Sequence, residues 1–235
     1  MKVLLYSGGM DSWLIDKLWK PDVKLYINID GDYSYEEMAR LPVDVKCVSF
    51  PLLGTFEQPD KFVPLRNLYF LMIASHYGDE LCLGATAGDG SKDKSFDFLV
   101  QMESMLSYFW DDKKVSKSIR IEKRFAQMSK GDLLREYLAG GGSIERVRAE
   151  TFSCYTPRDG KECGECYPCF RKFSILHANG CSYPREVREK MWNYIRTRVL
   201  PTKEEGGYVG TYYTDRGVES ADLVKAVDRL REEFA

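Results

Sequence analysis

Residues 2–12 read Lys-Val-Leu-Leu-Tyr-Ser-Gly-Gly-Met-Asp-Ser, an apolar run that leads directly into two glycines. The run over 2–6 is short and aliphatic and predicts a β-strand. Apolar residues at helical spacing predict a helix over 11–19, and Pro21 ends it because the residue before a proline avoids the α region. The segment therefore predicts a strand, a tight glycine turn and a helix in direct succession.

The same alternation continues along the first half of the chain. Further strands are predicted over 24–29, 44–50 and 80–84, with helices over 34–40 and 66–77 between them. Strands separated by helices pair in parallel through right-handed crossovers. The sequence therefore predicts an α/β fold, an open and mostly parallel sheet with helices on both faces.

The rest of the chain is predicted to be mainly helical. A polar loop over 85–95 leads into a helix over 96–108 that Ser95 would cap, and one more strand is predicted over 117–122. Later segments are predicted as helices over 130–138, 171–178, 184–199 and 221–234, and as a loop or hairpin over 204–217. The glycines at 140–142 suggest a boundary, so we expect an α/β domain over 1–142 and a small helical region over 143–235.

The composition is that of an ordinary globular protein. Of 235 residues, 44% are hydrophobic, and 34 basic and 36 acidic residues leave a formal net charge of −2. This balance argues against the strongly basic surface that is typical of nucleic-acid binding. No apolar run approaches the roughly 20 residues that span a bilayer, and the first glycine turn comes too early for a secretory signal. We therefore expect a cytoplasmic location.

The turn Ser7-Gly8-Gly9-Met10-Asp11-Ser12 is suited to binding phosphate. Glycine N–H groups can approach an anion closely, serine hydroxyls add donors, and the N-terminus of a helix carries partial positive charge. The turn has neither the lysine of the GxxxxGK[ST] loop nor the GxGxxG dinucleotide pattern. The simpler interpretation is a strand, a glycine turn and an Asp or Ser helix cap.

Four of the seven cysteines form a cluster with the spacing C-x8-C-x2-C-x2-C: Cys154, Cys163, Cys166 and Cys169. Four thiolates at such spacing suit tetrahedral zinc, and with every position filled by protein the role would be structural. An iron–sulfur cluster is the competing interpretation, and a catalytic thiol is a third. Without its metal the loop should unfold. The scattered Cys47, Cys82 and Cys181 are expected to be buried small hydrophobes.

The phosphate turn resembles the signature of the PP-loop ATP pyrophosphatases, which split ATP into AMP and pyrophosphate. Between residues 7 and 171 the chain resembles the 7-cyano-7-deazaguanine synthase family of queuosine-precursor synthesis, and the tail beyond about residue 183 is longer than is usual in that family. The resemblance rests on residues 7–12, 63–67 (Val-Pro-Leu-Arg-Asn), 151–155 (Thr-Phe-Ser-Cys-Tyr) and 163–171 (Cys-Gly-Glu-Cys-Tyr-Pro-Cys-Phe-Arg). Phe152 stands where the family usually has Trp, and 94–97 (Lys-Ser-Phe-Asp) replaces a Tyr-Pro-Asp-Cys-like segment that helps shape the acceptor pocket.

The resemblance implies a PP-loop fold similar to the adenine nucleotide alpha hydrolases. It implies ATP-dependent conversion of 7-carboxy-7-deazaguanine and ammonia to 7-cyano-7-deazaguanine through an adenylated intermediate, with ATP, Mg²⁺ and structural zinc. No glutaminase domain fits in the chain, so ammonia would come from solution or from a separate partner. A homodimer is expected, and no nucleic-acid partner.

The resemblance and the position of polar residues at the carboxyl edge of the sheet give a set of candidate site residues. ATP would be bound by Tyr6, Ser7, Gly8, Gly9, Met10, Asp11, Ser12 and Ile29. Catalytic roles are expected for Asp11, Arg66 and Lys92. The acceptor would be bound by Arg66, Asn67, Asp93 and Asp97. The metal would be bound by Cys154, Cys163, Cys166 and Cys169.

Other functions stay open at this point. A tRNA-modifying PP-loop enzyme, a thiolase or a lysidine synthase, predicts a basic face and, for thiolation, a cysteine poised to carry sulfur. A non-enzymatic zinc module with a decayed nucleotide site is a second alternative. A family member that stops at the amide, or that adenylates another carboxylate, is a third, since segment 94–97 is altered.

Overall fold

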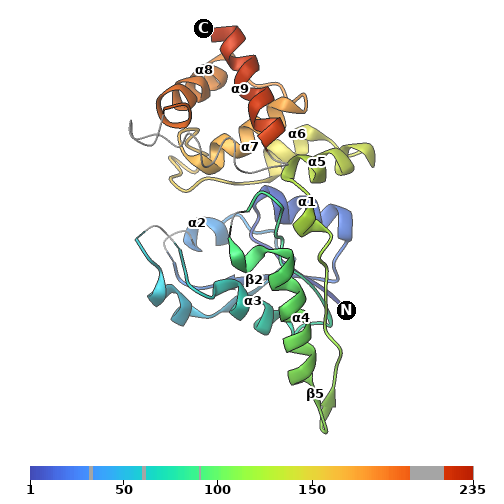
Figure 1. Cartoon of the computed structure of the whole chain (residues 1–235). Coiled ribbons are helices and arrows are strands. Elements are labelled where there is room, and N and C mark those ends of the chain that lie inside the picture. The colour runs from blue at the N-terminus through green and yellow to red at the C-terminus, as the bar shows by residue number, and fades with distance from the viewer. Residues whose placement is uncertain (32–33, 60–61, 90, 202–219, 235) are drawn as a thin grey trace. The chain divides into compact units, whose positions relative to one another are not determined.

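The computed structural model describes residues 1–31, 34–59, 62–89, 91–201 and 220–234 (Figure 1). The chain divides into two compact units, residues 1–127 and 128–235. The segment 204–217, predicted as a loop or hairpin, lies outside the described residues. Within the described ranges, none of the helices has the length and apolar character needed to cross a membrane.

The first unit is built on a five-stranded parallel sheet with the strand order β3-β2-β1-β4-β7. Its strands are β1 (Lys2–Leu5), β2 (Val23–Asn28), β3 (Val45–Ser49), β4 (Glu80–Cys82) and β7 (Arg120–Ile121). Val3 of β1 pairs with Val23 on one side and with Leu81 on the other. The strand order thus reverses between β1 and β4, and open α/β sheets bind ligands outside the carboxyl ends of the strands at such a point.

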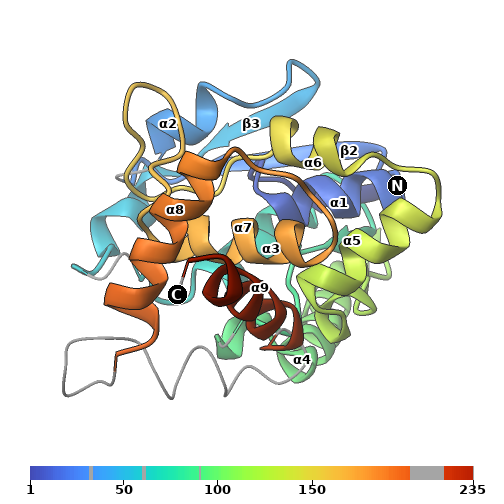
Figure 2. The same cartoon turned by 90° about the horizontal axis from the view of Figure 1, so that it is seen from above.

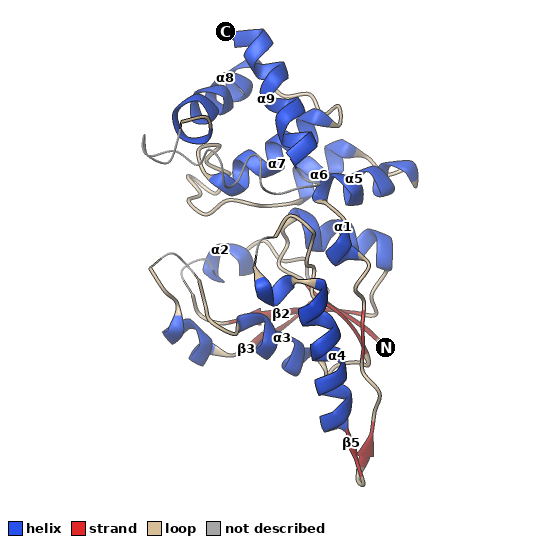
Figure 3. Cartoon of the chain, in the orientation of Figure 1, coloured by secondary structure: helices blue, strands red, loops and turns tan. Residues whose placement is uncertain are grey.

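Helices cover both faces of this sheet, as the sequence predicted (Figure 3). One face carries α1 (Met10–Trp19) and α2 (Ser34–Met38), and the other carries α3 (Arg66–Ala74) and α4 (Phe96–Trp110). Because side chains alternate along a strand, Val3 and Leu5 join the core under α3 and α4, while the fully buried Leu4 faces α1.

Two helix ends follow the sequence signals. α1 ends at Trp19, and its C-cap Lys20 takes a left-handed conformation with φ of 52° just before Pro21. Ser95 is the N-cap of α4, and its hydroxyl accepts a hydrogen bond of 3.1 Å from the backbone N–H of Phe98. A cap of this kind contributes about 1 kcal/mol to the stability of a helix.

Several short elements were not predicted. The hairpin strands β5 (Asp111–Asp112) and β6 (Val115–Ser116) follow α4, and the strand expected over 117–122 shrinks to β7. Strands of two residues carry no alternation of apolar and polar positions, so periodicity cannot reveal them. The 3₁₀ helices are η1 (Pro51–Phe56), η2 (Lys92–Lys94) and η3 (Phe125–Gln127).

The second unit is helical. Its elements are α5 (Lys130–Ala139), α6 (Ile144–Glu150), α7 (Tyr167–Ala178), α8 (Arg185–Tyr194) with a π-helix over Ile195–Val199, and α9 (Ser220–Phe234). α7 and α9 lie side by side (Figure 2). The apolar residues of α9 recur at helical spacing, and Leu223, Ala226, Val227 and Leu230 are fully buried.

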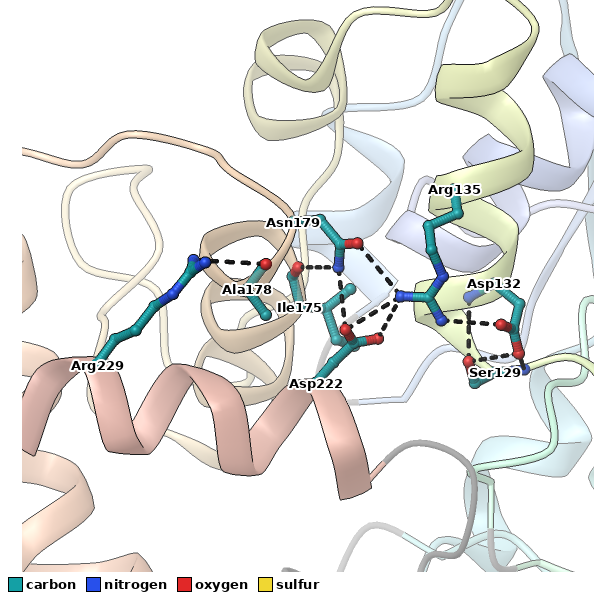
Figure 4. Close-up of polar contacts among 8 residues, drawn as sticks. All are labelled: Ser129, Asp132, Arg135, Ile175, Ala178, Asn179, Asp222 and Arg229. Atoms are coloured by element: carbon teal, nitrogen blue, oxygen red, sulfur yellow. Dashed lines mark hydrogen bonds and ion pairs between the residues drawn. The ribbon is translucent and has the colours of Figure 1, made fainter.

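The boundary between the units lies at 127/128, earlier than the expected 142/143, because α5 packs with the second unit. Arg135 of α5 donates hydrogen bonds to both carboxylate oxygens of Asp222 on α9, at 3.1 and 3.0 Å (Figure 4). The same guanidinium donates to Asn179 just after α7, at 3.2 Å. Gly131 permits this approach, since a Cβ there would lie 1.8 Å from Asp222 Oδ2.

Candidate functional site

The phosphate turn joins β1 to α1 at the point where the strand order reverses. Gly8 takes a φ of +75°, which is readily available only to glycine. The backbone N–H of Ser7 donates to Ser12 Oγ at 3.3 Å, and Ser12 Oγ donates to the carbonyl of Gly9 at 3.1 Å. Among the residues that the structure describes, no side chain caps α1 at Gly9, and the free N–H groups at the start of a helix are a site for an anion.

The end of β4 lies against this turn. Gly84 also has a positive φ of 73°, and a Cβ on it would lie 3.6 Å from the carbonyl of Leu5 and 3.9 Å from Ser12 Cβ. Thr86, two residues on, is buried, and its hydroxyl has no hydrogen-bond partner among the described residues. A buried polar atom of this kind calls for an explanation, and a bound phosphate or sugar would supply one. Sequence reasoning missed these two residues, because no local pattern reveals that β4 adjoins β1.

The side chains of Tyr6 and Met10 are buried, each 3% exposed. Both residues were expected to bind ATP. Because their side chains are buried in the core, any contact with ATP would come from their backbone groups. Ile29 is half-buried at the end of β2. η1 packs closely on that end, since a Cβ on Gly54 would lie 2.1 Å from the carbonyl of Ile29.

Two of the predicted acceptor residues are brought together. Asn67, on the first turn of α3 and 3% exposed, donates a hydrogen bond of 2.8 Å from Nδ2 to Asp93 Oδ2. The other oxygen of Asp93 accepts a hydrogen bond from the Ser91 hydroxyl. Asp93 is therefore held by two donors at the carboxyl edge of the sheet, in a geometry that leaves lone pairs on its oxygens for a further donor.

Lys92 and Asp97 are not brought into this arrangement. Both side chains are exposed, and in the described part of the chain neither is hydrogen-bonded or ion-paired to another predicted site residue. Asp97 lies in the first turn of α4, where a carboxylate stabilises the helix dipole. That role accounts for Asp97 without a substrate.

Arg66, the first residue of α3, is half-buried, and its guanidinium lies 5.9 Å from the ring centre of Phe70. A carboxylate that sequence reasoning missed, Glu37 of α2, lies near it. Glu37 accepts a hydrogen bond of 2.8 Å from the Tyr26 hydroxyl. Burial raises the pKa of Glu37, while the hydrogen bond from Tyr26 and the charge of Arg66 oppose that rise. Nothing in the sequence indicates that α2 and α3 place these charges near each other.

In the second unit the four clustered cysteines converge. Their sulfur atoms all lie within 4.8 Å of one another, and Cys163 Sγ and Cys169 Sγ are 4.0 Å apart. A tetrahedral zinc with Zn–S bonds of about 2.3 Å places its sulfurs about 3.8 Å apart. The cluster can therefore hold a metal ion with little movement. α7 begins at Tyr167, earlier than the predicted 171, so Cys166 is its N-cap and Cys169 lies on its first turn.

Backbone N–H groups donate hydrogen bonds to these sulfurs, and burial and neighbouring thiols shift the pKa of three of them. The N–H of Cys163 donates to Cys154 Sγ at 3.2 Å, and the N–H of Glu165 donates to Cys163 Sγ at 3.3 Å. Burial raises the pKa of Cys154 to about 11. A hydrogen bond between Cys166 and Cys169 lowers the pKa of the first thiol and raises that of the second. Metal binding would have to release these protons, as thiolate sites require.

Of the remaining cysteines, Cys82 and Cys181 are buried as expected. The expectation for Cys47 was wrong, since its side chain is exposed on the edge strand β3. An edge strand has a neighbour on one side only, so alternate positions along it can face solvent.

Comparison with protein families matches residues 51–179 to the family described as Queuosine biosynthesis protein QueC. This range is more than half of the 235-residue chain. The chain belongs to the QueC family. The matched range contains both the Asn67–Asp93 pair and the four clustered cysteines, whereas the phosphate turn lies before it.

Curated QueC-type relatives carry the name 7-cyano-7-deazaguanine synthase. One from Marinobacter nauticus is 25% identical over 222 residues, which cover 77% of this chain and 95% of the relative. One from Thermoplasma acidophilum is 30% identical over 140 residues, 57% of this chain and 56% of the relative. One from Leptospira biflexa is 32% identical over 134 residues, 53% of this chain and 50% of the relative. The latter two matches thus span about half the length of the relatives.

Among solved structures, the U34-tRNA thiolase NcsA from Methanococcus maripaludis with its 4Fe–4S cluster aligns with this chain at a TM-score of 0.37 and 14% identity. The alignment covers 100% of this chain and 74% of the thiolase. A TM-score this low supports no inference about the site or its metal.

Proposed function

We propose that this QueC-family chain converts 7-carboxy-7-deazaguanine and ammonia to 7-cyano-7-deazaguanine at the expense of ATP. One observation carries the proposal: a chain of this family presents a Ser-Gly-Gly turn and an uncapped helix N-terminus at the β1/β4 switch point. That is an anion site where the fold class binds its ligands. The names of the curated relatives supply the substrate class.

The phosphates of ATP would bind at the turn between β1 and α1. The backbone N–H groups of Gly8 and Gly9 and the start of α1 would donate to phosphate oxygens, and the Thr86 hydroxyl would gain the partner it lacks among the described residues. Asp11, on the first turn of α1, can only accept hydrogen bonds when ionised, so it would contact the phosphates through Mg²⁺ rather than directly.

The acceptor would bind beside the turn at the same edge of the sheet. A 7-deazaguanine ring presents N–H donors on its pyrimidine edge, and Asp93 offers a carboxylate already oriented by Asn67 and Ser91. Arg66 would bind the carboxylate of the acid, with Glu37 as its counter-charge when the site is empty. Lys92 and Asp97 are exposed, and no hydrogen bond or ion pair within the described ranges links either of them to the other acceptor residues.

The chemistry needs a good leaving group on a carboxylate, which is a poor electrophile. The acid oxygen attacks the α-phosphorus of ATP, forms an acyl adenylate and releases pyrophosphate. Ammonia then displaces AMP and leaves the amide. The amide oxygen attacks the α-phosphorus of a second ATP and releases a second pyrophosphate, and loss of AMP and of the remaining N–H proton then gives the nitrile. The residues of the turn would hold the reacting groups in line and offset developing charge.

For the metal we propose zinc in a structural role. Four thiols within bonding reach of one point fill a tetrahedral shell, which leaves no position for a substrate. The donor set alone also suits an iron–sulfur cluster. Metal analysis and the absorption spectrum of the purified protein separate the two, because zinc thiolates are colourless.

The test is an incubation of purified protein with Mg-ATP, ammonium and 7-carboxy-7-deazaguanine, with products read by mass spectrometry. We expect the nitrile, AMP and pyrophosphate. Asp11→Asn should lower the rate by about 100-fold. The matched control, Asp16→Asn on the same helix, removes a carboxylate that pairs with Lys17 at 2.7 Å and is not among the predicted site residues, so it should leave the rate unchanged.

Two outcomes would change the proposal. Accumulation of the amide alone would identify an enzyme that stops after one adenylation. ATP that stays intact with this acid would show that the acceptor is wrong, and other carboxylates would then have to be tested.

A further inference from the structure

Lys172 of α7 is a buried cation that no part of the proposed reaction uses. Its side chain is 5% exposed, and a buried ammonium is stable only when it is paired and hydrogen-bonded. Lys172 Nζ meets this condition with three partners. It donates to the carbonyl of Thr151 at 2.5 Å, to the carbonyl of Arg148 at 3.2 Å, and to both oxygens of Glu162 at 3.0 Å.

These partners stand next to the metal ligands in the chain. Glu162 immediately precedes Cys163, and its Oε1 also accepts a hydrogen bond of 2.6 Å from the N–H of Ser153. Ser153 immediately precedes Cys154. The carboxylate of Glu162 therefore joins the two ends of the loop that carries the first two ligands.

Lys172 connects that loop to the helix that carries the other two ligands. It lies three residues after Cys169 on α7, a spacing that puts both side chains on one face of a helix. Its two carbonyl partners are at the end of α6 and at the residue that follows α6, where carbonyls lack intrahelical donors. One ammonium thus ties together α6, α7 and both ends of the ligand loop.

We propose that Lys172 and Glu162 are positioning residues for the four-cysteine metal site. They hold Cys154 and Cys163 against Cys166 and Cys169, so that the sulfurs already converge before a metal binds. Ordering a loop costs conformational entropy, and a loop ordered in advance does not subtract that cost from the metal affinity. The inference rests on the proposed metal site and is independent of the synthase reaction.

The test measures metal binding directly, with Co²⁺ and Zn²⁺ as probes. Sulfur-to-cobalt charge-transfer absorption reports tetrahedral thiolate coordination, and competition with a chelator gives the dissociation constant for Zn²⁺. We expect Lys172→Met and Glu162→Ala each to weaken metal binding by about 10- to 100-fold, the usual effect of losing a group that orients metal ligands. The double variant should bind about as weakly as Lys172→Met, because the two residues act as one unit.

A control variant separates positioning from general stability. Arg135→Met removes the cation of another ion pair in the same unit, Arg135–Asp222 at 3.0 Å (Figure 4). It should lower the melting temperature and leave the metal dissociation constant and the cobalt spectrum unchanged. Lys172→Arg, which keeps a cation at the same position, should bind metal more tightly than Lys172→Met.

Each outcome of the metal-binding test either supports or overturns the positioning role of Lys172 and Glu162. Wild-type metal affinity in folded Lys172→Met and Glu162→Ala would overturn the inference. If Lys172→Met does not fold, Glu162→Ala decides alone, since it leaves the two carbonyl bonds of Lys172 in place. A wild-type chain that binds neither ion would overturn the metal site itself, and this inference with it, while leaving the proposed ATP chemistry untouched.

Discussion

Asn67 Nδ2 donates a hydrogen bond of 2.8 Å to Asp93 Oδ2, across 26 positions of sequence. Asn67 sits on the helix after the Val-Pro-Leu-Arg segment, and Asp93 sits in the loop after β4. The bond brings two candidate acceptor residues to one place and makes each depend on the other.

Loss of this hydrogen bond should lower both the stability of the fold and the affinity for the substrate. Asn67→Leu keeps the side-chain shape, removes the donor and leaves a half-buried carboxylate oxygen with one partner fewer. The free energy of unfolding should fall by about 1–3 kcal/mol, and KM for the acid should rise. Urea unfolding checks the first effect. Asn193→Leu, at an exposed position on α8, should stay within about 0.5 kcal/mol of wild type, and an equally small effect of Asn67→Leu would contradict the argument.

The backbone of Gly8 allows a second prediction. Gly8→Ala forces a residue with a Cβ into φ +75° and should destabilise the protein by about 1–2 kcal/mol, with a marked loss of ATP affinity because the turn would relax. Gly141→Ala is the matched control, with φ +85° and nothing within 4 Å of the added Cβ. We expect similar destabilisation and unchanged ATP binding by calorimetry. Equal ATP affinity in both variants would show that the turn is not the phosphate site.

The Thr86 hydroxyl has no hydrogen-bond partner among the described residues. Thr86→Val replaces it with a methyl group of similar shape and removes the cost of burying an unsatisfied hydroxyl, so the apo protein should be as stable as wild type or up to about 1 kcal/mol more stable. ATP should bind more weakly. A stability loss well beyond 1 kcal/mol with unchanged ATP affinity would mean that the hydroxyl serves the fold.

Removal of the metal should destabilise the second unit, which contains the four clustered cysteines. Cys154→Ser should abolish tight binding of Zn²⁺ and lower the melting temperature, and chelation of wild-type protein should do the same, because metal binding contributes to folding. Cys47→Ser alters an exposed thiol outside the cluster and should change neither. Zinc content is measured by mass spectrometry of metals and melting by circular dichroism. A melting temperature that chelation does not shift would argue against a structural metal.

His177 predicts a pH dependence in the acid range. Burial lowers the pKa of His177 below its usual value of about 6.5, with a smaller contribution from the charges of Arg229 and Arg188. Above pH 6.5 the imidazole is neutral in both states. Below it the unfolded chain takes up a proton that the folded chain does not, so the free energy of unfolding should fall as the pH drops from 6.5 to the folded pKa.

Urea unfolding between pH 5 and 7.5 measures this effect. His177→Phe, which can keep the stacking on Phe173, removes the titrating group and should reduce the slope. A variant whose slope matches wild type would assign the pH dependence to other groups.

The sequence determined the fold class because its signals are local. The aliphatic run over 2–6, the glycine turn and the alternation of strand and helix need only neighbouring residues to be recognised, and Ser95 caps α4 as the sequence predicted. The spacing of the four cysteines likewise predicts a metal site, since residues 163–169 must lie close together in any structure. The phosphate turn and the cysteine cluster depend on residue types and spacings that can be read from the sequence without knowledge of the fold.

The tertiary structure decided what depends on contacts between distant segments. Strand order placed Gly84 beside the phosphate turn, and α2 brought Glu37 near Arg66. The bonds of Lys172 to Glu162 and to the end of α6 join three pieces of chain, and α5 belongs to the second unit because Arg135 meets Asp222 across 87 positions. Such contacts are set by packing and burial, and no local pattern of residues encodes which distant partner a side chain will meet.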